Sequence, residues 1–192
     1  MYRVYFKGGT KIREEREQAM LEERMQEALN KQINEELYSA YLYLSMSAYF
    51  DNLGLKGFAN WMMVQYKEET DHAMKIYNYL LSQGAEVKLP PIQEPPHEWD
   101  SPLHAFQETL KHEQHITQCI NDLVDLAEEL KDRATYNFLQ WYIDEQVEEE
   151  KNDREIIDKL ELIGDSKNGL FMLDKDLGQR IYVPLIQEAS SN

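Results

Sequence analysis

Helix-breaking residues are few in this chain and lie in a small number of clusters. Only 8 glycines and 6 prolines occur among 192 residues. They leave four long stretches in which a glycine or proline occurs, if at all, only within the first few residues, where a helix tolerates it. These stretches cover about residues 20–50, 56–82, 102–130 and 134–163. At ~1.5 Å per residue, each would form a helix about 40 Å long. We therefore expect an all-α protein.

The connections between these stretches indicate how the helices are arranged. Residues 87–101 carry four prolines and cannot continue a helix, so we expect an extended crossover there, ending at Ser101 and Pro102 as N-cap and first helical position. The other two connections are short. This pattern predicts an antiparallel four-helix bundle with one long crossover in its middle. Residues 165–178 are expected to hold a short fifth, C-terminal helix.

The two ends of the chain differ in character from the helical part. Residues 1–19 are charged and lack periodic apolar positions, so we interpret them as an N-terminal extension, either a flexible arm or a leader left by cloning. Residues 20–178 are predicted to form the helical domain, and residues 179–192 a C-terminal tail.

The composition of the chain limits which molecules it can bind and where in the cell we expect it. The 20 basic against 36 acidic residues give a formal net charge of −16, which repels nucleic acid and anionic membranes and attracts cations. A single cysteine, Cys119, excludes an intramolecular disulfide framework and a cysteine-cluster metal site. No stretch is long and apolar enough to span a membrane, and the first residues do not resemble a secretory signal. We expect a cytoplasmic protein that binds neither nucleic acid nor membranes.

Charged residues interrupt the apolar, inward-facing row of every long helix. These rows follow the i, i+3/i+4 spacing that marks one face of a helix. The interruptions lie near the middle of each helix, so in a bundle of this connectivity they should converge at one height. The residues concerned are Glu36 in the first helix, Glu69 and His72 in the second, Glu113 in the third, and Glu145 and Glu149 in the fourth.

Several buried carboxylates need compensation by protons, basic side chains or metal cations, because each unpaired buried ion costs several kcal/mol. No Lys or Arg occupies these rows, so metal cations are favoured. Carboxylates with one imidazole suit iron, manganese or zinc. A dinuclear site follows from this set. Glu36 and His72 would be terminal ligands of one metal, Glu69 would bridge, and Glu113 with Glu149 would hold the second.

Simpler interpretations apply to some of these residues. Glu68, Glu145, Glu148 and Glu150 could form a solvated charged face, and His72 could be a hydrogen-bonded core histidine. The other histidines are expected to be ordinary surface residues: His97, His104, His112 and His115.

Local motifs give the chain a family resemblance. They are Asn34-Glu-Glu-Leu-Tyr-Ser39, Glu68-Glu-Thr-Asp-His72, Lys111-His-Glu113 and Glu145-Gln-Val-Glu-Glu-Glu150. Over about residues 20–178 the chain resembles the prokaryotic non-haem ferritins, which implies a ferritin-like bundle.

The resemblance also implies roles for individual residues. One iron would be held by Glu36, Glu69 and His72, and the other by Glu69, Glu113 and Glu149, with Gln146 beside them. A third iron position would use Glu68, Glu145 and Glu148, facing inward beside Glu149. Tyr43, two helical turns beyond Glu36 on the same face, matches a tyrosine thought to donate an electron to oxygen.

The function implied by this likeness is iron storage with ferroxidase activity. Fe(II) and dioxygen would be the substrates, and identical subunits would form a hollow shell of 24 that holds ferric mineral. No haem is expected, because the fourth helix has Gln146-x-x-Glu149 where haem-binding relatives have a second Glu-x-x-His. Two alternatives stay open. One is a passive shell that only nucleates mineral, and the other is a di-iron oxidoreductase that stores nothing.

Overall fold

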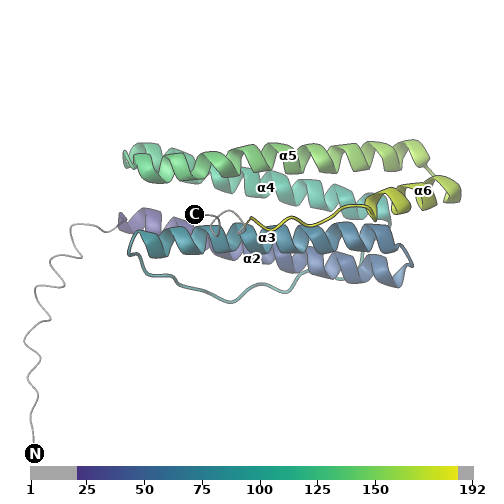
Figure 1. Cartoon of the computed structure of the whole chain (residues 1–192), viewed down its shortest axis with the longest axis horizontal. Coiled ribbons are helices and arrows are strands. Elements are labelled where there is room, and N and C mark those ends of the chain that lie inside the picture. Colours follow the sequence, from purple (N-terminus) through teal and green to yellow (C-terminus); the bar gives the residue numbers. More distant parts are fainter. Residues whose placement is uncertain (1–20, 186–192) are drawn as a thin grey trace, which may run out of the picture.

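The computed structural model describes residues 21–185, and this part of the chain folds into five helices with no strand. The prediction of an all-α protein is confirmed (Figure 1). The helices are α2 (Glu23–Asn52), α3 (Lys56–Ser82), α4 (Pro102–Glu129), α5 (Arg133–Ile163) and α6 (Lys167–Leu177). None of them is long and apolar enough to cross a membrane. The predicted extension over residues 1–19 and the end of the tail lie outside the described residues.

Two helical hairpins lie side by side, as the connection lengths predicted. Helix α2 packs along α3, α4 packs along α5, and α2 also contacts α4 (Figure 1). Ser101 caps α4 by accepting a hydrogen bond from the His104 amide at 3.0 Å, with Pro102 in the first turn. The four-helix bundle and the expected short C-terminal helix, α6, are therefore both confirmed.

The proline-rich crossover is held by hydrogen bonds to α2 rather than by secondary structure of its own. The Asn30 side chain donates to the Glu86 carbonyl at 2.9 Å and accepts from the Lys88 amide at 2.7 Å. Farther along, Tyr49 donates to the Trp99 carbonyl at 2.8 Å. Prolines lack a backbone N–H, so this segment cannot form regular backbone hydrogen bonds. Side chains of α2 instead form hydrogen bonds with its backbone N–H and C=O groups.

The core consists of two apolar clusters. One is rich in aromatic residues and includes Phe50, Phe58 and Phe106. The other is largely aliphatic and includes Leu29 and Ile76. Along each of the four long helices, the residues of one cluster come before the charged residues that interrupt the apolar row, and the residues of the other cluster come after them. Apolar packing at both ends thus fixes the four helices at the height where the acidic side chains meet.

Helix α6 is anchored to the beginning of α3. The residue before α3 forms no side-chain hydrogen bond that would cap the helix. The Asp174 side chain of α6 caps it instead, by accepting hydrogen bonds from the Gly57 amide at 2.8 Å and the Phe58 amide at 3.1 Å. A Cβ atom on Gly57 would lie 1.5 Å from the Asp174 carbonyl oxygen, so only glycine permits this approach. The contact fixes where the chain leaves α6.

We expect Asp174→Ala to lower the free energy of unfolding by ~1 kcal/mol, the usual value of a helix cap. Gly57→Ala should cost more, because its Cβ meets a backbone atom that cannot rotate away. Urea unfolding followed by circular dichroism measures both effects. The control is Lys175→Ala, an exposed change on the same helix that should stay within about 0.5 kcal/mol of the parent. A Gly57→Ala protein as stable as the control would contradict this packing of α6 on α3.

Candidate metal centre

The five side chains predicted to bind two metals all lie buried in the middle of the bundle. Their exposed fractions are 1% for Glu36, 2% for Glu69, 3% for His72, 1% for Glu113 and 6% for Glu149. One helix supplies Glu36, another supplies Glu69 and His72, and α4 and α5 supply one glutamate each. The helical spacing therefore placed all five on inward faces correctly.

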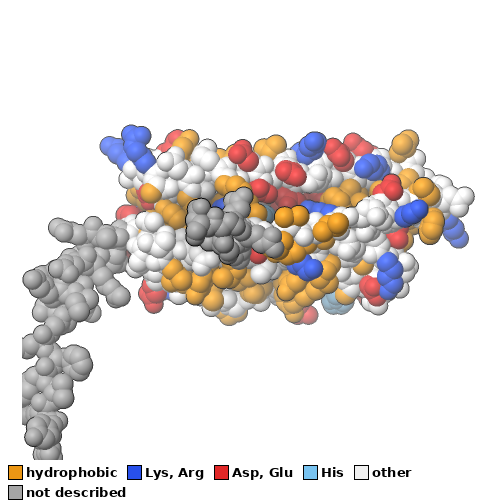
Figure 2. Space-filling view, viewed as in Figure 1, with side chains coloured by type: hydrophobic (Ala, Val, Ile, Leu, Met, Phe, Trp, Pro, Cys, Tyr) orange, Lys and Arg blue, Asp and Glu red, His pale blue; other side chains and the backbone are white. Residues whose placement is uncertain are grey.

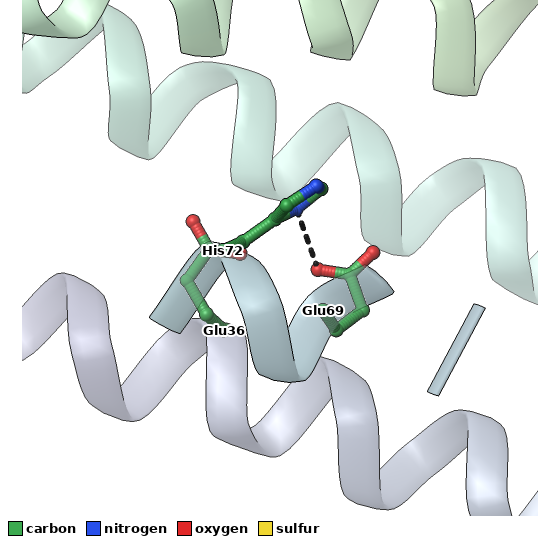
Figure 3. A group of neighbouring side chains, drawn as sticks. All are labelled: Glu36, Glu69 and His72. Carbon is green, nitrogen blue, oxygen red and sulfur yellow. Dashed lines mark ion pairs between the residues drawn. The ribbon is translucent and has the colours of Figure 1, made fainter. Parts of the chain in front are cut away.

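Three of these side chains already have the proximity that a single metal ion requires. One ligand atom from each of Glu36, Glu69 and His72 can be chosen so that all three lie within 4.8 Å of one another (Figure 3). The Nδ1 atom of His72 lies 3.3 Å from Oε2 of Glu69. These atoms converge from α2 and α3.

The carboxylates of α4 and α5 are oriented by neutral hydrogen-bond donors. Tyr43 donates its hydroxyl hydrogen to Oε1 of Glu113, and Gln146 Nε2 donates to Oε2 of the same residue at 3.0 Å. Gln65 Nε2 donates to Oε2 of Glu149 at 2.8 Å. These donors fix the carboxylates without neutralising their charge. Gln146 lies beside the centre, where the resemblance placed it.

Two carboxylate oxygens in the centre have no hydrogen-bond donor within residues 21–185. They are Oε2 of Glu36 and Oε1 of Glu69. Buried polar atoms are rarely left without a partner, since each one costs about 1–3 kcal/mol. Both oxygens belong to the three-residue group described above. The orphaned atoms therefore fit bound cations.

Burial changes the protonation of the carboxylates. Burial raises the pKa of Glu36 to about 8, and the Glu69 carboxylate adds to this rise. Burial, with a further contribution from Glu149, raises the pKa of Glu113 to about 7. The pKa of Glu69 is raised well above its ordinary value by burial and then by Glu113. In the absence of metal, protons therefore relieve the repulsion, and cations would have to replace those protons.

Comparison with known proteins identifies the family of this chain. The family model of the ferritin-like domain matches residues 26–163. The chain belongs to the ferritin family. A bacterial non-heme ferritin of Bacteroides fragilis (strain 638R) is 42% identical over 161 residues, which cover 84% of this chain and all of the relative. A probable bacterial non-heme ferritin-like protein of Haemophilus influenzae is 44% identical over 159 residues, 83% of this chain and 96% of the relative.

Solved structures of archaeal ferritins resemble this ferritin over most of its length. The open pore ferritin of the hyperthermophilic archaeon Archaeoglobus fulgidus is 56% identical, has a TM-score of 0.83, and matches 84% of this chain and 99% of its own. A closed form engineered from the A. fulgidus ferritin is 55% identical with a TM-score of 0.84, over 85% of this chain and 99% of its own. The predicted likeness to prokaryotic non-haem ferritins is thus confirmed.

The residues predicted for a third iron position lie nearer the surface of this ferritin. Glu68 and Glu145 are half-buried, but Glu148 is exposed, so the expectation that all three face inward is wrong for Glu148. Successive helical residues are rotated by about 100°, and Glu149 takes the inward direction, which turns Glu148 toward solvent. Burial raises the pKa of Glu68 to about 7, although Arg180 opposes the rise.

Asp153 is a buried carboxylate that sequence reasoning missed. It is 2% exposed, lies one helical turn beyond Glu149 on α5, and its Oδ2 atom has no donor among the described residues. Burial, followed by the Glu113 charge, raises its pKa well above the ordinary value. The spacing Gln146, Glu149, Asp153 was a signal that could have revealed it. In the sequence, this signal is obscured by the polar neighbours of Asp153.

His112 was also misplaced, since it was expected at the surface and is half-buried between α4 and α2. Its Nε2 atom lies 2.8 Å from the Ser39 hydroxyl, and its ring meets the Tyr43 ring edge-to-face at 6.2 Å. Burial, with a smaller effect of His115, lowers the pKa of His112 to about 4. His112 is therefore a neutral neighbour of Tyr43.

Proposed function

We propose that this ferritin is an iron-storing ferroxidase. It would bind two Fe(II) ions in the buried centre, oxidise them with dioxygen, and pass the ferric product to a mineral inside a shell of identical subunits. One observation carries this proposal. Five acidic or imidazole side chains from four helices are buried in the core, and three of them, Glu36, Glu69 and His72, are close enough to share one ion, with carboxylate oxygens of Glu36 and Glu69 unpaired within residues 21–185. Membership of the ferritin family supports iron storage.

The charges of the proposed ligands match a ferrous pair. Glu36 and His72 would hold one ion, Glu69 would bridge, and Glu113 with Glu149 would hold the other. The four carboxylates, once deprotonated, balance two Fe²⁺ ions. After oxidation the two ions carry six positive charges against four negative ones. The surplus charge favours loss of protons from bound water and departure of the ferric product.

The oxidation itself transfers one electron from each ferrous ion. Dioxygen accepts the two electrons and two protons and leaves as hydrogen peroxide. We assign Tyr43 the role of an auxiliary electron donor, which can supply one of these two electrons in place of a ferrous ion, because its buried hydroxyl donates to Glu113 at the centre. Burial, then the Glu113 charge, raises the pKa of Tyr43 well above 10, so it carries its proton. That proton can pass to Glu113 when an electron leaves Tyr43.

Size and iron content together test the storage proposal. We expect iron-loaded protein to elute in size-exclusion chromatography near half a megadalton by light scattering, about 24 times the subunit mass of 22.8 kDa. It should carry far more iron than two ions per subunit. Dioxygen uptake on adding two Fe(II) per subunit tests the ferroxidase step.

The same measurements separate the two alternatives. A monomer that binds two irons and takes up no more would indicate a non-storage di-iron oxidoreductase. A large mineralising shell with slow dioxygen uptake would indicate passive storage.

A further inference from the structure

The chain after α6 turns back and runs along α3, over the seam between α3 and α5 (Figure 1). We call residues 178–185 the C-terminal strap. In the space-filling view of this face, acidic side chains gather in the seam (Figure 2). The strap thus lies where the half-buried carboxylates of the third position meet the surface.

Arg180 of the strap reaches into this acidic seam. Its Nη2 atom lies 2.6 Å from Oε2 of Glu68, and its Nη1 donates to Oε1 of Gln65. Gln65 in turn donates to Glu149 at 2.8 Å. The guanidinium also stacks over the Trp61 ring, 4.1 Å from its centroid. Arg180 therefore contacts a third-position carboxylate directly and reaches a ligand of the paired centre through one amide.

We propose that Arg180 is a built-in cation of the third position, and that a metal ion binds there only by displacing the guanidinium from Glu68. This inference rests on the proposed function and on the third iron position that the family resemblance implies. The two cations compete because both would draw on the single negative charge of the Glu68 carboxylate, whose Oε2 atom Arg180 already contacts. Arginine does not lose its charge at any ordinary pH, so the competition persists throughout the working range. Arg180 would thereby make the third position weaker than the paired centre.

The strap has a second attachment that allows Arg180 to leave without unfolding. Tyr182 donates its hydroxyl hydrogen to Oδ2 of Asp71 at 2.6 Å, and the Leu185 amide donates to the same oxygen at 3.1 Å. Lys67 lies over the Tyr182 ring at 5.3 Å. These contacts lie on the far side of Arg180 from α6, whose own anchor is Asp174. The arginine is thus held between two fixed points and can exchange with a metal by moving its side chain alone.

Calorimetric titration of the metal-free, full-length protein with Zn²⁺ alone tests the competition. We expect three binding steps per subunit, two for the paired centre and a third for the third position. The third step is identified as the one that the Glu68→Gln variant lacks. Arg180→Gln should tighten this step about tenfold, the effect of freeing a carboxylate from one charge-assisted hydrogen bond. Arg180→Lys, which keeps the charge, should stay within about twofold of the parent. Arg24→Gln is the matched control, because it removes the same charge from an exposed pair with Glu129 and should change nothing.

Trp61 gives a second readout that does not depend on the Arg180 variants folding. As Zn²⁺ fills the third step, departure of the guanidinium should change the tryptophan emission of the parent protein. The change should be absent from Trp61→Phe, which keeps the two other tryptophans.

The outcomes distinguish failure of this inference from failure of the proposed function. If the first two Zn²⁺ ions bind and the third step is no tighter in Arg180→Gln, or if parent emission is constant through that step, the displacement model is wrong. If the parent protein does not bind even two Zn²⁺ ions, the paired centre is wrong and the proposed function falls with it.

Discussion

Replacing Glu69 by alanine is expected to slow oxidation of the first two ferrous ions per subunit by about 10²-fold or more. The change removes the proposed bridge, and with it one ligand from each iron. Loss of an outer-shell partner of a metal ligand already lowers metal affinity or activity by about 10–100-fold, so loss of a shared ligand should cost at least as much. His72→Ala removes a ligand from one iron only and should have a smaller effect. Stopped-flow absorbance after mixing with two Fe(II) per subunit in air gives both rates.

The control for these variants is Glu108→Ala, an acidic residue of α4 that forms a surface ion pair with Lys111. It should oxidise iron at the parent rate. A Glu69→Ala protein with an unchanged rate would mean that the oxidation site lies elsewhere. Equal losses in Glu69→Ala and His72→Ala would contradict the bridging role, though not the location of the centre.

The metal-free protein is expected to lose stability as pH rises from about 5 to about 8. Burial raises the pKa of Glu36 to about 8 and of Glu113 to about 7, whereas both residues ionise near their ordinary value of 4.5 in the unfolded chain. Between these values the folded state binds more protons than the unfolded state, so the free energy of unfolding falls with rising pH. The expected loss is several kcal/mol, at ~1.4 kcal/mol per pH unit for each group.

Urea unfolding at pH 5.5 and pH 8, with a chelator present, measures this loss. The double variant Glu36→Gln/Glu113→Gln keeps the side-chain shapes without the charge, so it should show a flatter pH dependence and unfold later than the parent at pH 8. Adding Zn²⁺ to the parent should restore stability most strongly at pH 8, because metals bind the deprotonated carboxylates. A metal-free parent that gains stability up to pH 8 would contradict the account of buried, proton-holding carboxylates.

The helices and the inward direction of the buried acidic side chains could be predicted because their signals are local and periodic. Glycines and prolines marked the bounds of α3 as residues 56–82, and the structure has Lys56–Ser82. Glu36, Glu69 and Glu113 stood out because each interrupts an otherwise apolar row. A charge in such a row has few physical explanations, so each one was informative.

The parts that escaped prediction have a weak signal or none. Glu148 and Asp153 lie in a stretch of α5 where most residues are charged, so the inward row of Gln146, Glu149 and Asp153 stands out only weakly from its neighbours. Arg180 contacts Glu68 across 112 positions of the sequence, and no periodicity connects the two. The position of the strap depends on how α6 docks on Gly57, a tertiary contact.

Anomalous X-ray diffraction at the iron absorption edge, on crystals soaked anaerobically with Fe(II), tests the central claim most directly. We expect two peaks about 3.5–4 Å apart in each subunit, the usual separation in two-metal sites. One should lie among Glu36, Glu69 and His72, and the other among Glu69, Glu113 and Glu149. Iron found only on the acidic surface, with the buried centre empty, would contradict the claim that these side chains form a di-iron site.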